Sequence, residues 1–275
     1  MSEECTHNCD TCTANCSSRE KTDLREAPNP RSSVKKVIAV MSGKGGVGKS
    51  LVTSLLAVNL QRKGYKVGIM DADLTGPSIP QMFNLHGMAE ADESALFPVT
   101  TEKGIDVMSL NLLMEDVTNP VVWRGPVIAG TVKQFWTDVV WKDVDFLFVD
   151  MPPGTGDVPL TVLQSLPVNG VVVVTSPQEL VEMIVEKAVK MTGMLNTPVI
   201  GIAENYSYFQ CPDCGKKHEI YGPSRVKEIA TRYDIENIAK IPVDPRLAAA
   251  ADAGKIEEYE GDWLDGLTAA CEALL

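Results

Sequence analysis

Gly43-Lys44-Gly45-Gly46-Val47-Gly48-Lys49-Ser50 is the stretch of this 275-residue chain that decides its fold. It follows a short β-branched apolar run at 37–41 and precedes a segment, 51–62, that has the pattern of a helix. Glycines here let backbone N–H groups curl around phosphate oxygens, and the start of the helix adds its positive dipole end. A strand, a turn ending in Gly-Lys-Ser and a helix form the context that a phosphate-binding P-loop requires.

Two side chains of this loop and one further carboxylate predict an Mg-ATP site. We expect Lys49 to neutralise the β- and γ-phosphates and the Ser50 hydroxyl to ligate Mg²⁺. The apolar strand at 146–149 ends at Asp150, at the carboxyl edge of the predicted sheet, where ligands bind in open α/β folds. Asp150 is therefore expected to hold Mg²⁺, directly or through water.

Other positions at the ends of strands favour hydrolysis. Residues 151–157 have the composition of a switch loop in which the Gly154 amide can face the γ-phosphate. Asp71 and Asp73 follow another strand, and one of these carboxylates could orient the attacking water. A single aspartate at a strand end can equally be a cap or turn residue, but three such positions beside a P-loop favour a catalytic site.

The remaining pattern predicts an α/β fold with a doubly wound, mostly parallel sheet and a single domain. Strands are expected at 66–70, 145–149, 170–175 and 198–203, and a helix at 179–195, with several strands apolar throughout. The first 33 residues differ: they hold a cysteine cluster followed by a polar segment with two prolines and no apolar period. We therefore expect a tail and linker over 1–33 and an ATPase domain over 34–275.

Composition excludes some functions. The chain is 44% hydrophobic and 23% charged, with a net charge of −12, which disfavours nucleic acid as a partner because DNA binding relies on Lys and Arg. The first residues lack an apolar targeting segment and the apolar runs are too short to cross a bilayer, so no membrane association is expected. A cytoplasmic location is predicted, where free thiols serve metal or redox chemistry.

The N-terminal cysteines predict a metal site. Cys5, Cys9, Cys12 and Cys16 lie within twelve residues, a close spacing similar to ferredoxin cluster loops. Thiolates are soft ligands that select iron–sulfur clusters, zinc or cuprous ion. Structural zinc sites usually separate two cysteine pairs by a longer segment, so iron–sulfur is favoured over zinc, with flexible thiols as a third alternative.

Cys211 and Cys214 form half of a metal site in the sequence Cys-Pro-Asp-Cys-Gly. A zinc knuckle with His218 as a third ligand is one alternative, whereas a thioredoxin-type pair is disfavoured because the segment lies in a polar loop. Two-fold symmetry offers another, since a dimer would bring two thiols from each chain together as four ligands. Cys271 lies in an amphipathic pattern and is expected to be a buried apolar residue.

Several segments together resemble a known family. The additional lysine, Lys44, is typical of the variant P-loop of the MinD, ParA and nitrogenase iron protein class. The segments 71–78, 123–126, 150–157 and 211–214 closely resemble the Mrp/ApbC family, which includes the eukaryotic cytosolic iron–sulfur scaffold ATPases. The resemblance extends from residue 34 to about residue 250, and the cysteine tail is similar to that of the eukaryotic scaffolds.

The resemblance implies roles for individual residues. Lys44 would reach the phosphates of the partner subunit in a homodimer that sandwiches ATP, and Asp73 would position the hydrolytic water. Asn205 would contact the adenine, and the backbone of Gly43, Gly45, Gly46, Val47 and Gly48 would cradle the phosphates. A [4Fe–4S] cluster would bridge Cys211 and Cys214 of both subunits, and apo iron–sulfur proteins would receive clusters.

Three functions are compatible with these features. An ATP-hydrolysing iron–sulfur cluster scaffold or carrier is favoured. A positional switch like MinD or ParA is disfavoured, because the acidic C-terminal residues 260–275 contain no Lys or Arg for membrane binding and the net charge opposes DNA binding. A nucleotide-gated reductase like the nitrogenase iron protein is disfavoured because that class bridges its cluster with widely separated cysteines.

Overall fold

In the computed structural model of the protein, the residues described are 23–116, 123–177 and 181–275. Within these residues, eight strands form one sheet in the order β10-β7-β6-β1-β5-β2-β4-β3. Neighbouring strands are parallel except for β3 and β4. The strands of this sheet are β1 (Val34–Ser42), β2 (Val67–Asp71), β3 (Val99–Thr100), β4 (Asp106–Met108), β5 (Val144–Asp150), β6 (Val168–Thr175), β7 (Val199–Glu204) and β10 (Ile238–Lys240).

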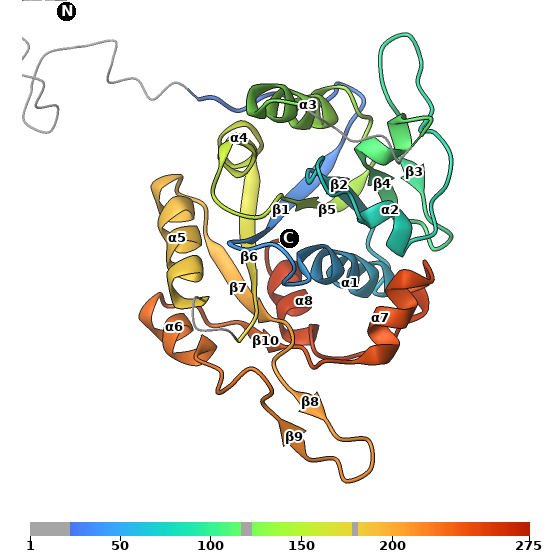
Figure 1. Ribbon diagram of the computed structural model, residues 1–275. Coiled ribbons are helices and arrows are strands. Elements are labelled where there is room, and N and C mark those ends of the chain that lie inside the picture. The colour runs from blue at the N-terminus through green and yellow to red at the C-terminus, as the bar shows by residue number, and fades with distance from the viewer. Residues whose placement is uncertain (1–22, 117–122, 178–180) are drawn as a thin grey trace, which may run out of the picture.

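Helices cover both faces of this sheet (Figure 1). They are α1 (Lys49–Arg62), α2 (Ile79–Met82), α3 (Gly125–Thr137), α4 (Asp157–Ser165), α5 (Val181–Met194), α6 (Val226–Arg232), α7 (Pro245–Asp252) and α8 (Asp265–Glu272), with the short 3₁₀ helices η2 (Leu110–Leu113) and η3 (Ile256–Glu258). The strands and helices predicted from the sequence are confirmed, and so is the mostly parallel α/β class.

Two apolar cores, one on each face, explain the double winding. Alternate residues of β1 point to opposite sides, so Ala39 packs with α3, α4, α5 and α6. Val40 packs on the other side with α1, α2, α7 and α8. Because the strands are buried on both faces, they are apolar throughout. Cys271 on α8 is fully buried in the second core, which confirms its predicted apolar role; burial raises the pKa of its thiol to about 12.

Strand register brings the chemical residues to one edge of the sheet. Asp150 is paired with Val40 of β1 and with Asp71 of β2, so β5 and β2 end at the same level and β1 continues only to Ser42. The P-loop follows β1 directly. The carboxyl edge therefore carries the P-loop and the strand-end carboxylates together, as expected for an open parallel sheet.

The second half of the expected linker packs against the domain. The Glu26 amide donates to the Ser165 carbonyl (2.8 Å), and Trp136 Nε1 donates to the Glu26 carbonyl (2.9 Å). Asn29 is buried, and its Nδ2 donates to the carbonyl of Asp138 (3.3 Å). The sequence predicts a linker here, but residues 26–33, which we call the strap, are fixed by polar contacts with α3, α4 and the start of β5.

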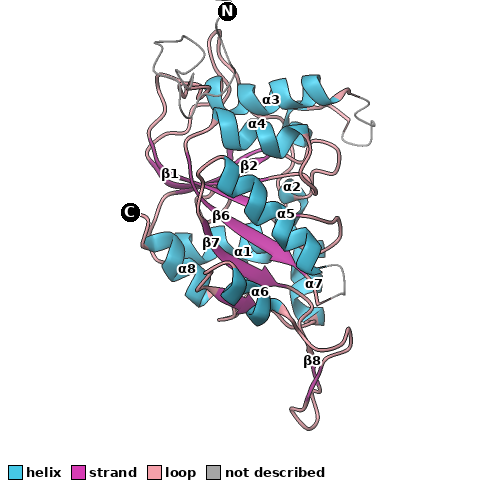
Figure 2. Cartoon of the chain, turned by 90° about the vertical axis from the view of Figure 1, so that its left-hand side faces the viewer, coloured by secondary structure: helices cyan, strands magenta, loops and turns pink. Residues whose placement is uncertain are grey.

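One excursion projects from the domain. Between β7 and α6, the short strands β8 (Phe209–Gln210) and β9 (Lys217–His218) pair antiparallel and form a hairpin that extends away from the body (Figures 1 and 2). This hairpin carries Cys211 and Cys214. None of the described helices is long and apolar enough to span a bilayer.

Candidate functional site

The P-loop adopts a conformation that only glycine tolerates at two positions. Gly46 and Gly48 have φ angles of 78° and 81°, in the left-handed region. Gly48 is the N-cap of α1, and a Cβ at this position would lie 2.2 Å from Asn205 Nδ2. The loop therefore curls tightly into the 14-residue α1, whose first-turn N–H groups and dipole favour an anion.

Asp150 is the centre of the site. Its carboxylate is fully buried at the end of β5, and Lys49 Nζ lies 2.6 Å from Oδ2. The Ser50 hydroxyl donates to the same oxygen at 2.6 Å, and the Thr53 hydroxyl donates to Oδ1 at 2.6 Å. The predicted residues Lys49, Ser50 and Asp150 are thus brought together. Thr53 was missed by sequence reasoning, although its spacing of four residues from Lys49 places it on the same helix face.

The two aspartates after β2 differ in exposure. Asp73 lines the cavity and lies 3.9 Å from Lys49 Nζ, and burial raises the pKa of its carboxyl while Lys49 opposes the shift. Asp71 is fully buried, and burial, followed by the charge of Asp150, raises the pKa of its carboxyl to about 8. Asp71 accepts hydrogen bonds from the Ser109 hydroxyl (3.0 Å) and the Asp73 amide (3.2 Å). Its carboxyl therefore serves contacts in the protein interior. No sequence signal marked Ser109.

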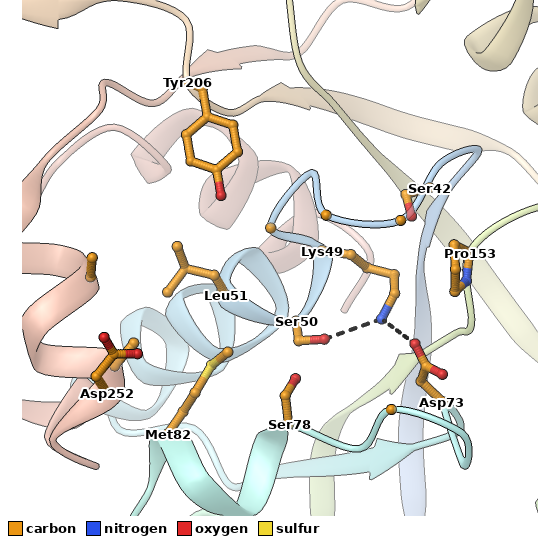
Figure 3. A pocket seen from close by; sticks show the side chains of 16 residues that line it. Ser42, Lys49, Ser50, Leu51, Asp73, Ser78, Met82, Pro153, Tyr206 and Asp252 are labelled. Carbon is orange, nitrogen blue, oxygen red and sulfur yellow. Dashed lines mark hydrogen bonds and ion pairs between the residues drawn. The ribbon is translucent and has the colours of Figure 1, made fainter.

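The switch loop lies against the end of β1. The Gly154 amide donates to the Ser42 carbonyl at 2.7 Å, so the predicted contact with a γ-phosphate would require this loop to rearrange. The Ser42 hydroxyl is buried and has no hydrogen-bond partner among the described residues. Ser42 and Pro153 both line the cavity, as Figure 3 shows. An unpartnered buried hydroxyl at this position fits a polar ligand bound beside the loop.

Asn205, the residue predicted to contact the adenine, lies beside the P-loop. Asn205 is buried, its Nδ2 donates to the Val47 carbonyl (3.0 Å), and its Oδ1 accepts from the Tyr206 amide (2.9 Å). Tyr206 has a φ angle of 57°, an uncommon conformation for a large residue. This turn brings Tyr206 to the cavity wall, so Tyr206 lines the cavity while Asn205 supports the P-loop from behind.

A cavity of about 370 Å³ joins these parts. Figure 3 shows Lys49, Ser50 and Asp73 on one side and Leu51, Met82 and Tyr206 at the other end. The wall is completed by residues of the P-loop, of the loop before α2 and of α7: Gly45, Gly46, Gly48, Gly76, Ser78, Ala248, Ala251 and Asp252. The polar end offers the Lys49 ammonium group and side-chain oxygens, and it is continuous with a partly apolar end. Such a cavity fits a nucleoside phosphate with Mg²⁺. Lys44 is exposed on the loop beside this cavity.

The thiol pair lies at the tip of the β8–β9 hairpin. The Cys211 amide donates to the Lys216 carbonyl (3.0 Å) and the Gly215 amide donates to the Cys211 carbonyl (2.9 Å), which closes a tight turn with Gly215 at φ 70°. The backbone N–H group of Cys214, and to a smaller extent that of Asp213, hydrogen-bonds to the Cys211 sulfur and lowers the pKa of its thiol. Cys214 is exposed. The turn therefore favours the thiolate that binds metal.

A complete single-chain metal site is not formed by this hairpin. Across residues 23–116, 123–177 and 181–275, no three His, Cys, Asp or Glu side chains gather closely enough to hold a metal ion. The alternative in which His218 completes a zinc knuckle with Cys211 and Cys214 therefore finds no support. Cys5, Cys9, Cys12 and Cys16 lie outside the described residues.

Comparison with known proteins gives a consistent result. Residues 33–267 match the family described as ParA: NUBPL iron-transfer P-loop NTPase. The iron–sulfur cluster carrier protein of Methanococcus maripaludis is 42% identical over 261 residues, which cover 92% of this chain and 90% of that protein. These similarities extend over most of the chain, beyond the P-loop itself.

Solved structures agree with the observed fold. A nucleotide-binding protein from Archaeoglobus fulgidus, solved in complex with ADP, is 46% identical with a TM-score of 0.76, covering 84% of this chain and 91% of that one. The cell division ATPase MinD of Pyrococcus furiosus, at 18% identity and a TM-score of 0.62 over 87% of this chain and 99% of that one, shares the fold. The resemblance inferred from the motifs is confirmed: this chain belongs to the Mrp/NUBPL-type family of MinD/ParA-like P-loop NTPases, the family of the iron–sulfur cluster carrier proteins.

Proposed function

We propose that this protein is an ATPase that carries an iron–sulfur cluster on cysteine thiolates and transfers it to apo-proteins. The observation that carries the proposal is the Cys211–Cys214 turn, which favours a thiolate. This turn is the tip of the segment that leaves the domain just after Asn205, beside the P-loop. A thiol pair and a nucleotide site are thus connected through one short segment. The carrier proteins to which this chain is similar support the same activity.

Nucleotide binding would use the side chains gathered around Asp150. Lys49 would neutralise the β- and γ-phosphates, and Ser50 with Asp150 would supply the oxygen ligands for Mg²⁺, which neutralises charge on the phosphates. Asp73 would orient the hydrolytic water, because it reaches the cavity while Asp71 does not. A raised pKa at Asp73 suits a carboxylate that takes a proton from water. Tyr206 would border the base, while Asn205, expected from the resemblance to contact the adenine, lies outside the cavity lining and would hold the P-loop instead.

The thiol pair requires a second copy of the chain. A [4Fe–4S] cluster takes four thiolate ligands, and Cys211 and Cys214 provide two. In a two-fold homodimer the same turn of the partner subunit would provide the other two. The exposed position of Lys44 beside the cavity suits a reach to the partner's nucleotide, which would sandwich ATP between the subunits.

A second cluster is proposed on the N-terminal tail. Cys5, Cys9, Cys12 and Cys16 provide four thiols on one chain, so this site would not depend on dimerisation. Recipients would be apo iron–sulfur proteins, with neither nucleic acid nor membrane as a partner. We place the activity in the cytoplasm, where thiols remain reduced.

Anaerobic reconstitution with iron and sulfide tests the proposal. Iron content, Mössbauer spectra and oligomer mass would be compared for the unaltered chain, for Cys214→Ser and for the matched control Cys271→Ala, whose thiol is buried in the core. We expect a bridged dimer with both kinds of site to hold 2 × 4 + 4 = 12 irons, about four of which are lost in Cys214→Ser only. In a chain without the tail thiols, one zinc per chain together with normal dimerisation of Cys214→Ser would exclude the bridging cluster.

A further inference from the structure

A buried carboxylate closes the base of the thiol hairpin. Glu204 is the last residue of β7 and is fully buried. Its Oε1 accepts from the Ser224 hydroxyl at 2.9 Å, and its Oε2 accepts from the Ser207 hydroxyl. Lys240 Nζ lies 3.9 Å from Oε2 and supplies a counter-charge.

The two serines are the two ends of one excursion. Ser207 lies where the chain leaves β7, and Ser224 lies where it returns to start α6. Residues 208–223, which include the β8–β9 hairpin and both thiols, project between them (Figures 1 and 2). One carboxylate therefore ties the outgoing and the returning segment together. The Val243 amide, which donates to the Tyr208 carbonyl at 2.8 Å, adds a backbone contact at the base of the hairpin.

The same point adjoins the P-loop. Asn205 follows Glu204 directly, is buried, and donates to the Val47 carbonyl. Gly48 packs so closely on the Asn205 amide that no Cβ fits between them. The Glu204 backbone is held in turn at the end of β10: Glu204 pairs with Lys240, and the amide of Ile241, which follows β10, donates to the Glu204 carbonyl at 2.9 Å. A displacement of residues 47–48 must therefore be accommodated by the segment 204–206.

We propose that Glu204 is a positioning residue that couples the nucleotide site to the Cys211–Cys214 turn. A change at the P-loop moves Asn205, and the two hydrogen bonds of Glu204 pass this change to both ends of the excursion, so that the exposure of the thiols follows the nucleotide. The cluster-binding role of the thiols rests on the proposed function, but the coupling itself is a property of the metal-free chain.

A carboxylate is suited to this role. Burying a charge is costly unless it is hydrogen-bonded and paired, and Glu204 has two hydroxyl donors and Lys240. Its two oxygens accept from two serines at once, whereas a glutamine would keep one such bond and would have to donate its NH2 to the other serine. A purely apolar residue would fill the space but would leave the two segments unconnected.

Thiol alkylation tests the coupling without a cluster. Metal-free protein would be treated with iodoacetamide, with and without Mg²⁺ and a non-hydrolysable ATP analogue, and the rates at Cys211 and Cys214 would be measured separately by peptide mass spectrometry. In the unaltered chain we expect the analogue to change the rate at Cys214 about fivefold, within the usual range of coupling between two sites. In Ser224→Ala and Glu204→Leu we expect the ratio of the rates with and without the analogue to approach one.

Controls separate coupling from damage to the fold. Ser224→Thr keeps a hydroxyl and should restore the response, while Thr231→Ala removes a hydroxyl from α6 that contacts Lys227 and should leave the response unchanged. Affinity for the analogue should be the same in Ser224→Ala and in the unaltered chain, which a collapsed nucleotide site would not allow.

The outcomes also separate this inference from the proposed function. If iron does not bind but the analogue changes alkylation in the unaltered chain and not in Ser224→Ala, the cluster role is wrong and the coupling stands. If the unaltered chain and Ser224→Ala respond alike, or if neither responds, the coupling is wrong whatever the iron content.

Discussion

Lys49 and Asp150 form a buried ion pair at the carboxyl edge of the sheet, with Nζ 2.6 Å from Oδ2 and side-chain exposures of 6% and 0%. The lysine that is expected to meet phosphate is therefore also the counter-charge of the carboxylate that is expected to meet Mg²⁺. A divalent cation beside Asp150 would supply the same counter-charge and free Lys49 for the phosphates. Removing Lys49 should therefore affect both binding and stability.

Lys49→Met should abolish ATP binding and also destabilise the nucleotide-free protein. Removing one partner of a buried ion pair leaves an uncompensated charge, which costs about 3–5 kcal/mol. The free energy of unfolding from urea titration would measure this loss. The double variant Lys49→Met/Asp150→Asn should regain most of the stability and still bind no nucleotide. Equal stability of Lys49→Met and the unaltered chain would show that the pair is not a structural one.

Lys44→Ala should retain part of the ATP affinity and lose hydrolysis, because its target is the phosphate of the partner subunit. Mixing gives a sharper test: a dimer of one Lys44→Ala subunit and one Asp73→Asn subunit contains one site with both groups intact. An equal mixture should therefore recover about a quarter of the unaltered rate, since half the dimers are mixed and each has one intact site. Hydrolysis at the unaltered rate by Lys44→Ala alone would contradict the sandwich dimer.

Asp71→Asn should change the pH dependence of stability in the nucleotide-free protein. The carboxyl has a pKa of about 8 in the fold and 3.8 as its ordinary value, because burial and Asp150 disfavour its charge. Its contribution to stability is full below the ordinary pKa and is lost as pH rises through about 8. In the unaltered chain, this carboxyl should make the free energy of unfolding fall with rising pH by at most about 1.4 kcal/mol per pH unit, and Asp71→Asn should remove that decrease. Urea unfolding at pH 5, 6, 7 and 8 measures it; identical slopes would contradict a protonated Asp71.

The central strands and the P-loop could be predicted because local sequence determines them. An apolar strand, a glycine turn and a helix are adjacent in the chain, and Asp150 marks the end of its own strand. The local pattern does not distinguish Asp71 from Asp73, since both follow the same strand, and only the family resemblance indicated Asp73; the burial of Asp71 beside Ser109 is a property of the folded chain. Thr53 was detectable from helix spacing, whereas Ser109 and Ser224 are brought to their partners by distant segments.

Polar contacts account for the segment that sequence reasoning described least well. Residues 26–33 have no apolar period, so nothing in their sequence predicts packing. They are nevertheless held because Asn29 and the backbone at Glu26 satisfy donors and carbonyls of α3 and α4. The hydrogen bond of Gly154 to Ser42 likewise depends on two segments that are far apart in the chain. Hydrogen bonds of this kind cannot be predicted from either segment alone, because the two segments meet only in the folded sheet.

Two truncations should therefore differ in stability. A chain that begins at Asp23 loses the tail thiols and keeps the strap, whereas a chain that begins at Val34 also loses the partners of Trp136 and Asp138. Trp136 is almost fully buried, and an unsatisfied buried N–H costs about 1–3 kcal/mol. The free energy of unfolding, measured by urea titration, should fall by at least about 2 kcal/mol for the Val34 start and remain unchanged for the Asp23 start.

Both chains should lose the same tail iron on anaerobic reconstitution, so iron content serves as the control. Asn29→Ala in the full chain should reproduce part of the loss, because it leaves the Asp138 carbonyl without the Nδ2 donor. If the chain that begins at Val34 is as stable as the one that begins at Asp23, the strap is a linker that merely lies on the surface.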